Sequence, residues 1–495
     1  MKTLKKAMSV LVSLLMIFTF ALPAFADSAT TYTIKAPDTT HQYEIYQIFT
    51  GDLHEGNGAK ILSNVKWGAN GTGTVGNAVD STIIAELTGV NTGTDREILN
   101  VVEQYAKLDS TPVATITNGA TYSATAGYYL IKDKDGRVSG TDTYTTYIVQ
   151  VVGNVTITPK GNVPSFEKKV KDTNDTTGAT SDWQDSADYD IGDVVPFKLE
   201  GTVASNYADY KTYYFAFHDQ AEDGLTFNKD SVKVYVDTTE INTGYKVVTS
   251  TTDGDTFDVV FDNLKDIADV RAGSKITVEY TATLNTQAAL GSQGNVNKAK
   301  LEFSNNPNEE QNGSNKPKTG ETPWDNVIVF TYQVVVNKTK ANGDALTGAE
   351  FTLEKVLKNG TKETVAVVKN TEGTTFTFKG LDDGDYILTE TVTPATYNTI
   401  EPIEFTVTAD HNIVWDGVNR TGVLTGLTGN TADGKVTFTA SADKSELTTN
   451  VINQSGATLP GTGGIGTTIF YVIGGLLMAV AAVLLITKKR MNSDK

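Results

Sequence analysis

Short runs in which apolar and polar residues alternate dominate the chain between its two ends. Clear examples are residues 232–236, 276–283 and 376–378. Alternation with a period of two places apolar side chains on one face of an extended strand, and abundant Thr, Val, Tyr, Asn and Gly suit strands joined by turns. The pattern therefore predicts a mainly β chain of tandem antiparallel β-sandwich domains. Residues 79–107 are the main exception, because their apolar positions recur at roughly helical spacing.

Two breaks divide this β-rich region into domains. One is the Pro- and Gly-rich joint at 159–164, and the other is the polar stretch 304–325. The length of the chain allows about three domains of ordinary size. The expected order is an N-terminal domain 27–160, a middle domain 164–305, a linker 306–321 and a C-terminal domain 322–455.

The first residues have the pattern of a secretory signal. Lys2, Lys5 and Lys6 precede an apolar run, and a small-x-small cleavage site ends at Ala26. We therefore expect residues 1–26 to be removed and the mature chain to start at Asp27. An uncleaved N-terminal anchor is the alternative, but the apolar core is short.

The other end holds a pentapeptide directly before an apolar run. Its residues are Leu459, Pro460, Gly461, Thr462 and Gly463. Residues 465–487 are long enough to cross a bilayer, and the basic tail 488–495 is expected on the cytoplasmic side. This order resembles the cell-wall sorting signal of Gram-positive surface proteins, which sortase transpeptidases cleave. The alternative is a tail-anchored membrane protein with an accidental pentapeptide.

Composition removes several classes of function. The formal net charge is −18, which disfavours binding to nucleic acid and to anionic lipid. The chain has no Cys, so disulfides, zinc thiolate sites and Cys nucleophiles are excluded. The four His residues are scattered without ligand spacing, and no metal or cofactor is expected.

Strand parity places three polar side chains inside the C-terminal domain. Residues two apart share a face of a strand. Lys338 then continues the apolar face formed by residues 328–336, Glu390 follows Tyr386 and Leu388, and Asn453 follows Val451. Each of these polar groups would be costly alone in an apolar core.

The middle domain repeats this pattern. Lys168 shares a face with Phe166, Asp219 with Phe215 and Phe217, and Asn297 with Ala299, Leu301 and Phe303. The two domains thus carry Lys, acid and Asn in the same order and at similar spacing.

Amide formation between Lys and Asn is the chemistry that needs this set. Burial makes the amine neutral and nucleophilic, and keeps the acid protonated so that it can assist at the Asn carbonyl. Proximity supplies the rate, so no cofactor is needed. The alternatives are ordinary ion pairs, Lys168 with Asp219 and Lys338 with Glu390, or surface residues whose register is misjudged.

Several segments resemble SpaA-type major pilins, the backbone subunits of sortase-assembled pili. Residues 384–397 are similar to the pilin E-box Y-x-L-x-E-T-x-x-P-x-x-Y, and residues 345–351 to a collagen-adhesin B-type domain. Residues 295–307 resemble the end of a middle pilin domain. Thr158-Pro159-Lys160 lies where the pilin motif places its lysine, although the motif has an aromatic residue where Thr158 stands.

The resemblance implies a role for each matched residue. A class C sortase would cleave after Thr462 and join it to Lys160 of the next identical subunit, and a housekeeping sortase would pass the finished fibre to peptidoglycan. Tip and base minor pilins are implied as partners, and the chain would be an extracellular, wall-anchored protein of Gram-positive bacteria. The collagen-adhesin resemblance implies Ig-like sandwich domains, and self-generated Lys–Asn isopeptide bonds fit this family. Any host surface ligand stays open.

Two regions give weaker signals. Asp133 occupies the acid position in the N-terminal domain, but Lys35 is poorly placed as its partner, so no isopeptide bond is expected there. The acidic run 172–193 lacks the regular ligand spacing of a calcium loop, and a solvated loop is expected.

Two other functions compete with that of a pilus shaft. A monomeric wall-anchored adhesin would share the sorting signal and the isopeptide bonds but would not need Lys160. A wall-anchored enzyme, such as a glycosidase, would place paired carboxylates in a cleft rather than on core faces. No nucleophile motif, phosphate loop or metal cluster supports an enzyme.

Overall fold

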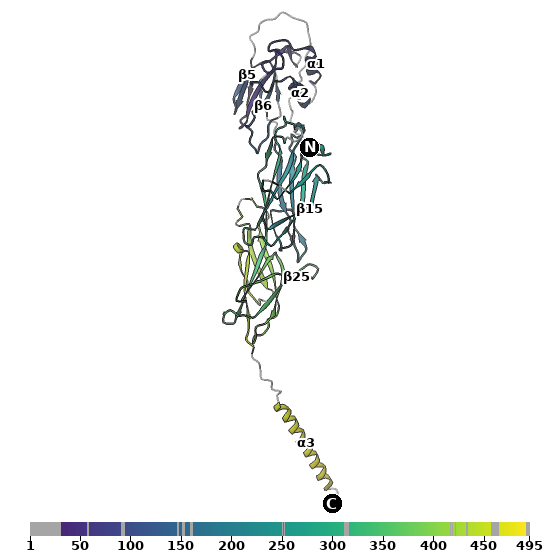
Figure 1. Cartoon of the computed structure of the whole chain (residues 1–495), viewed down its shortest axis with the longest axis vertical. Helices are drawn as coiled ribbons and strands as arrows, with labels where there is room; N and C mark the ends of the chain where they lie inside the picture. Colours follow the sequence, from purple (N-terminus) through teal and green to yellow (C-terminus); the bar gives the residue numbers. More distant parts are fainter. Residues whose placement is uncertain are drawn as a thin grey trace, which may run out of the picture.

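Three β-rich domains follow one another along an elongated molecule, and a single long helix stands beyond them (Figure 1). The computed structural model describes residues 31–491 except 57–58, 91–94, 146–147, 151–153, 159–161, 250, 252, 311–315, 416, 418, 421, 432–433 and 457–464. The signal sequence, Lys160 and the pentapeptide 459–463 therefore lie outside the described residues. The predicted mainly β, multi-domain class is confirmed.

The N-terminal domain holds two sheets and the short helices. One sheet has the order β3-β2-β6-β7 with β4 also on β2, and the other has the order β5-β1-β8. Helices α1, α2 and η1 all fall within residues 79–107, where helical spacing was predicted, and Ile84 and Leu87 are buried. The elements are β1 (Thr31–Lys35), β2 (Gln42–Gly56), β3 (Ala59–Trp67), α1 (Ser81–Gly89), α2 (Asp95–Val102), η1 (Glu103–Tyr105), β4 (Ala114–Thr117), β5 (Thr121–Thr125), β6 (Gly127–Asp133), β7 (Ile148–Gln150) and β8 (Val155–Thr156).

The middle domain is a sandwich of two sheets around one aromatic-rich core. The larger sheet runs β12-β22-β20-β14-β18-β17 with β21 on β20, and the smaller runs β16-β15-β19-β13-β9. Its elements are β9 (Ser165–Val170), β10 (Thr173–Asn174), β11 (Ala179–Thr180), β12 (Ser186–Asp188), β13 (Val194–Thr202), η2 (Tyr207–Asp209), β14 (Phe215–Ala221), β15 (Leu225–Val236), β16 (Thr239–Ile241), β17 (Lys246–Val248), β18 (Phe257–Phe261), η3 (Leu264–Asp266), β19 (Lys275–Leu284), β20 (Asn295–Ser304), β21 (Thr319–Glu321) and β22 (Asp325–Phe330).

The predicted border between the middle and C-terminal domains was wrong. Strands β21 and β22, which the sequence analysis assigned to the linker 306–321 and to the domain 322–455, both pair with β20 of the middle domain. The chain changes sheets at Thr331, between β22 and β23. The apolar alternation runs across this point, so the pattern alone does not mark the border.

The C-terminal domain is a second sandwich, with sheets β26-β27-β23-β32-β31 and β25-β24-β28-β29-β30. Its first and last strands, β23 and β32, pair in parallel from Gln333↔Glu446 to Lys340↔Asn453. Its elements are β23 (Tyr332–Lys340), β24 (Glu350–Val356), β25 (Lys362–Val365), β26 (Val367–Lys369), β27 (Thr375–Leu381), β28 (Gly384–Val392), β29 (Ile403–His411), β30 (Leu424–Thr431), β31 (Thr439–Ser441), η4 (Ala442–Lys444) and β32 (Glu446–Asn453).

A strap from the middle domain packs on the C-terminal domain. We define this interdomain strap as residues 171–193, which include the β10–β11 hairpin. Lys358 N donates to Asp175 O over 2.9 Å, and Trp415 N donates to Asp185 Oδ2 over 3.0 Å. The expectation of a solvated loop was wrong, because Asp185 and Asp188 are only 4% and 3% exposed at this interface.

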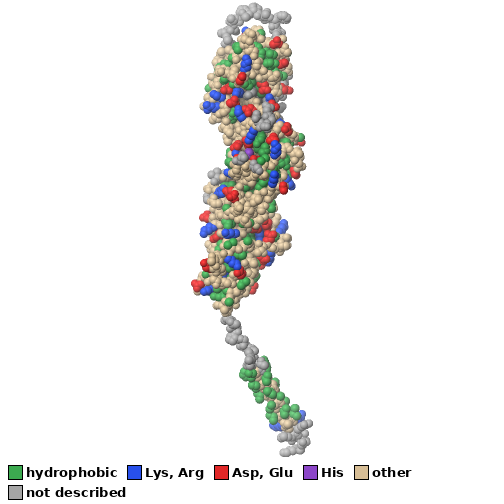
Figure 2. Space-filling view, viewed as in Figure 1, with side chains coloured by type: hydrophobic (Ala, Val, Ile, Leu, Met, Phe, Trp, Pro, Cys, Tyr) green, Lys and Arg blue, Asp and Glu red, His purple; other side chains and the backbone are tan. Residues whose placement is uncertain are grey.

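Helix α3 (Ile465–Met491) follows the last domain. Its apolar side chains project outward all round, as Figure 2 shows at the lower end of the molecule. Residues Ile469–Lys489 are long and apolar enough to cross a membrane. Exposing such an apolar surface to water is unfavourable, which agrees with the predicted membrane segment.

Candidate functional site

The middle domain brings together the three polar residues that strand parity placed inside it. Lys168 lies on β9 in one sheet, while Asp219 on β14 and Asn297 on β20 lie in the other. All three are 0% exposed. The site therefore lies between the two sheets, and we call it the middle triad.

A tyrosine that the sequence analysis missed connects this triad. The Tyr280 hydroxyl on β19 accepts hydrogen bonds of 2.8 Å from both Lys168 Nζ and Asn297 Nδ2, and donates one of 2.6 Å to Asp219 Oδ2. Lys168 Nζ also donates to Asp219 Oδ2. A hydroxyl has one proton and two lone pairs, so these three bonds use its full capacity.

Burial controls the charge in the middle triad. It lowers the pKa of the Lys168 amine and raises the pKa of the Asp219 carboxyl, against the opposing attraction between the two groups. Both shifts favour the neutral forms. Asp219 Oδ1 and Asn297 Oδ1 have no hydrogen-bond partner in the described structure, so an acid proton on Asp219 and the carbonyl oxygen of Asn297 are both uncommitted. The arrangement can present a neutral amine and a neutral acid to an amide.

The C-terminal domain assembles the second triad, Lys338 on β23, Glu390 on β28 and Asn453 on β32. Lys338 Nζ donates to Asn453 Oδ1 and, over 2.9 Å, to Val451 O. Asn453 Nδ2 donates to Glu390 Oε1 over 2.9 Å and to Oε2 over 3.1 Å. The amide of Asn453 is thus held between the amine and the acid, and we call this site the C-terminal triad.

The two triads differ in what the lysine contacts. Lys338 Nζ is 3.9 Å from Glu390 Oε1, whereas Lys168 bonds its acid directly. Burial lowers the pKa of Lys338 from 10.5 to about 8, so about a tenth of this amine is neutral at pH 7, far more than for an exposed lysine. In the C-terminal triad the amine already contacts the carbonyl group that it would attack.

The E-box supplies the surroundings of Glu390. Glu390 Oε2 accepts from Thr393 Oγ1 over 3.2 Å and from the backbone N of Ile400 over 3.1 Å. These donors orient the carboxylate, both oxygens of which also accept from the Asn453 amide. The family motif therefore has a local physical role in this chain.

In the N-terminal domain, the acid Asp133 contacts a histidine. Asp133 Oδ1 bonds His41 Nδ1 over 2.8 Å, and Asp142 Oδ2 bonds His41 Nε2 over 2.9 Å. The two carboxylates raise the pKa of His41 to about 9 against the effect of burial. Lys35 is exposed on β1. Imidazole cannot form a stable isopeptide bond, so this contact cannot serve as a triad of the same kind.

Three family models match the chain. Residues 191–307 match the Gram-positive pilin backbone subunit 2, Cna-B-like domain, and residues 332–421 match the SpaA prealbumin-like fold domain. Residues 452–493 match the LPXTG cell wall anchor motif. The second match begins at Tyr332, where β23 begins, in agreement with the domain border in the structure.

Similar proteins come from other Gram-positive bacteria. The trypsin-resistant surface T6 protein of Streptococcus pyogenes serotype M6 is 28% identical over 391 residues, which are 67% of this chain and 70% of that protein. The solved T6 backbone pilin of the same serotype, described as a modular three-domain structure, has a TM-score of 0.51 at 22% identity and covers 87% of this chain and 100% of its own. The full-length major pilin SpaD from Corynebacterium diphtheriae has a TM-score of 0.47 at 16% identity, covering 86% and 98%.

Proposed function

We propose that this chain, a Gram-positive backbone pilin with an LPXTG cell wall anchor motif, forms a pilus shaft in which each subunit is covalently joined to the next. The main support for this proposal is the order of parts along the chain. A middle domain that matches a pilin backbone model is followed by the cell wall anchor motif and the apolar helix α3. The protein is anchored to the cell wall and lies in an extracellular pilus.

The linkage exchanges one amide for another. A pilus-specific sortase breaks the peptide bond between Thr462 and Gly463 and holds Thr462 as a thioester, while the anchor segment leaves with a free amine. The Nζ of Lys160 on the next subunit then attacks the thioester carbon; the C–S bond breaks, the sortase sulfur leaves as a thiol with the amine proton, and an amide remains. In the sequence, Lys160 falls between β8, the last strand of the N-terminal domain, and β9, the first strand of the middle domain. A contact between two different surfaces gives an open filament rather than a closed ring.

Each triad makes one internal cross-link by a balanced reaction. The neutral lysine Nζ bonds to the side-chain carbonyl carbon of the Asn, and the bond from that carbon to Nδ2 breaks. One proton passes from the amine to the leaving nitrogen, with the buried acid as relay, and ammonia is released. The contact between Lys338 and Asn453 Oδ1, and the shared Tyr280 hydroxyl in the middle triad, support this assignment.

The linkage is tested by an immunoblot of muramidase-released cell wall. Wild type is compared with Lys160→Ala and with Lys66→Ala, a control at an exposed lysine of the N-terminal domain. We expect a high-mass ladder in wild type and control, and a monomer band in Lys160→Ala. A ladder that persists in Lys160→Ala would show that Lys160 is not the linking residue. A single wall-linked band in all three strains would favour a monomeric adhesin.

The cross-links are tested by intact mass. The full chain is purified from membranes of a sortase-deficient strain, so that it stays monomeric. We expect a mass below that of the processed sequence by two molecules of ammonia, one for each triad. A mass equal to that of the processed sequence would leave both triads as ordinary buried polar clusters.

A further inference from the structure

The interface between the middle and C-terminal domains concentrates negative charge. Seven aspartates from the interdomain strap and from the turn between β27 and β28 meet there, and none of them is exposed: Asp172, Asp175, Asp188, Asp190, Asp193, Asp382 and Asp383. In the described part of the chain, the basic side chains that pair with them are Lys355 and His411. Buried carboxylates in such excess need a further cation or must bind protons.

Lysine neutralises one half of this interface. Lys355 Nζ on β24 bonds Asp190 Oδ2 over 2.6 Å, lies 3.4 Å from Asp175 Oδ2 and also bonds Asp382. The ammonium group thus occupies the centre of one acidic cluster. This half of the interface has its own cation.

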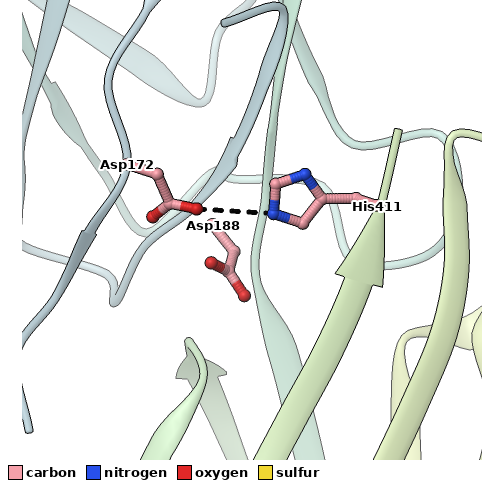
Figure 3. Close-up of side chains that lie close together, drawn as sticks. All are labelled: Asp172, Asp188 and His411. Atoms are coloured by element: carbon pink, nitrogen blue, oxygen red, sulfur yellow. Dashed lines mark ion pairs between the residues drawn. The ribbon is translucent and has the colours of Figure 1, made fainter. Parts of the chain in front are cut away.

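The other half converges on a histidine instead. Asp172, Asp188 and His411 lie close together (Figure 3), and one potential ligand atom from each lies within 4.8 Å of the other two. Asp188 is 3% exposed, and its Oδ2 has no hydrogen-bond partner in the described structure. The neighbouring Tyr332 hydroxyl has no partner either, although it is close enough to Asp188 to affect its charge.

Hydrogen bonds fix which nitrogen of His411 faces the carboxylates. Ser186 Oγ lies 2.5 Å from the carbonyl oxygen of Asn412, which can only accept, so the hydroxyl proton of Ser186 is used there. His411 Nδ1, 2.7 Å from the same Oγ, must then donate its proton to Ser186. Nε2 faces Asp172 at 3.4 Å. In the neutral ring, Nε2 has a lone pair on the side of Asp172 and Asp188. A metal-binding histidine has the same arrangement: one nitrogen is free for the ion, and the other is held by a hydrogen bond, here to Ser186.

We propose that Asp172, Asp188 and His411 Nε2 bind a divalent transition-metal ion of the Zn²⁺ class. One imidazole and two carboxylates suit Zn²⁺, which takes three protein ligands with a fourth position for water. Calcium prefers six to eight oxygen ligands and is the poorer match. The side chain of Asp172 is 19% exposed and gives the ion a route to solvent.

The ion would join two domains. Asp172 and Asp188 belong to the strap of the middle domain, and His411 ends β29 of the C-terminal domain. Binding would fix the angle between these domains in every subunit. It would also raise the melting temperature, because the ligand set exists only in the folded, docked state.

The test is Zn²⁺ binding to the full chain in detergent after dialysis against a chelator, followed by calorimetry and metal analysis. We expect one Zn²⁺ per chain, retained in excess Ca²⁺. His411→Asn and Asp188→Asn should each weaken binding at least about 100-fold, beyond the effect of losing an outer-shell partner. Ser186→Ala, which removes only the outer-shell acceptor, should weaken it about 10-fold.

Two matched controls should bind as wild type does. His218→Asn removes a buried histidine whose two nitrogens already contact Asp258 and Glu302. Asp193→Asn removes a carboxylate from the lysine half of the same interface. Absence of Zn²⁺ binding to wild type at micromolar concentration would overturn the proposal. So would a His411→Asn variant with wild-type affinity, or displacement of Zn²⁺ by Ca²⁺.

Discussion

Replacing Glu390 by Gln should prevent the cross-link of the C-terminal domain while keeping the shape of the side chain. Glu390 is the only acid in contact with Asn453 among the described residues, and both of its oxygens accept from the Asn453 amide. A Gln cannot relay a proton, so Lys338 and Asn453 should remain separate. Once the mass change of the substitution itself is subtracted, the variant should be heavier than wild type by one ammonia.

The loss of stability can be worked out from the structure. Lys338 and Asn453 are 115 residues apart, and closing a loop of about 100 residues is worth about 4.7 kcal/mol in the chain-entropy model. The new amide NH₂ must also face either Asn453 Nδ2 or the backbone N of Ile400, which leaves a buried donor without an acceptor at about 1–3 kcal/mol. The total is about 6–8 kcal/mol, or about 25–30 °C at roughly 4 °C per kcal/mol for a domain of this size.

Scanning calorimetry of the full chain, with intact mass on the same sample, checks this value. Glu350→Gln is the control, because Glu350 forms an exposed ion pair with Lys369 that is worth about 0–1 kcal/mol. We expect the C-terminal transition to fall only in Glu390→Gln. An ammonia loss that persists in this variant would refute the role of the acid. A missing cross-link with an unchanged melting temperature would refute the entropy argument.

The other two predictions concern the middle and N-terminal domains. Tyr280→Phe removes the hydroxyl that contacts all three members of the middle triad, so ammonia loss from this domain should be slower, as pulse-labelled intact mass would detect; a rate equal to wild type would exclude a positioning role. In the N-terminal domain, the pKa of His41 rises from 6.5 to about 9 beside Asp133 and Asp142. Its folded form binds the proton more tightly, so this contribution to the free energy of unfolding is complete below pH 6.5 and is lost as pH rises through 9. Denaturant titrations across this range should show the decline in wild type and not in His41→Asn, and an equal decline in both would assign it to other groups.

Strand parity predicted which triad residues are buried, because alternation with a period of two fixes the direction of every side chain once one face of the strand is known. Once Tyr332, Val334 and Val336 face a core, Lys338 must face it too, and the structure places it there at 0% exposure. The same logic held for Lys168 on β9. Local alternation thus predicts which side chains are buried, although it does not give the distances between them.

Alternation within a strand does not predict contacts between segments that are far apart in the sequence. Tyr280 was one of several aromatic residues on inward faces, and nothing in its neighbours marked it as the partner of Lys168. The interdomain strap was expected to be solvated, because its composition does not reveal that the end of β29, more than 200 residues later, packs on it. The domain border failed for a related reason, since the pairing of β22 with β20 is non-local.

The parallel pairing of β23 with β32 determines how the C-terminal domain responds to mechanical load. The chain enters β23 at Tyr332 from the neighbouring domain and leaves β32 at Asn453 toward the membrane helix, so a pull along the molecule acts on opposite ends of two parallel strands. Their backbone hydrogen bonds are therefore loaded together in shear and do not open one after another. With Lys338 bonded to Asn453 near the exit, the force path would run along β23 and directly out of the domain. The residues between those two positions would then carry no tension, and the domain could not extend.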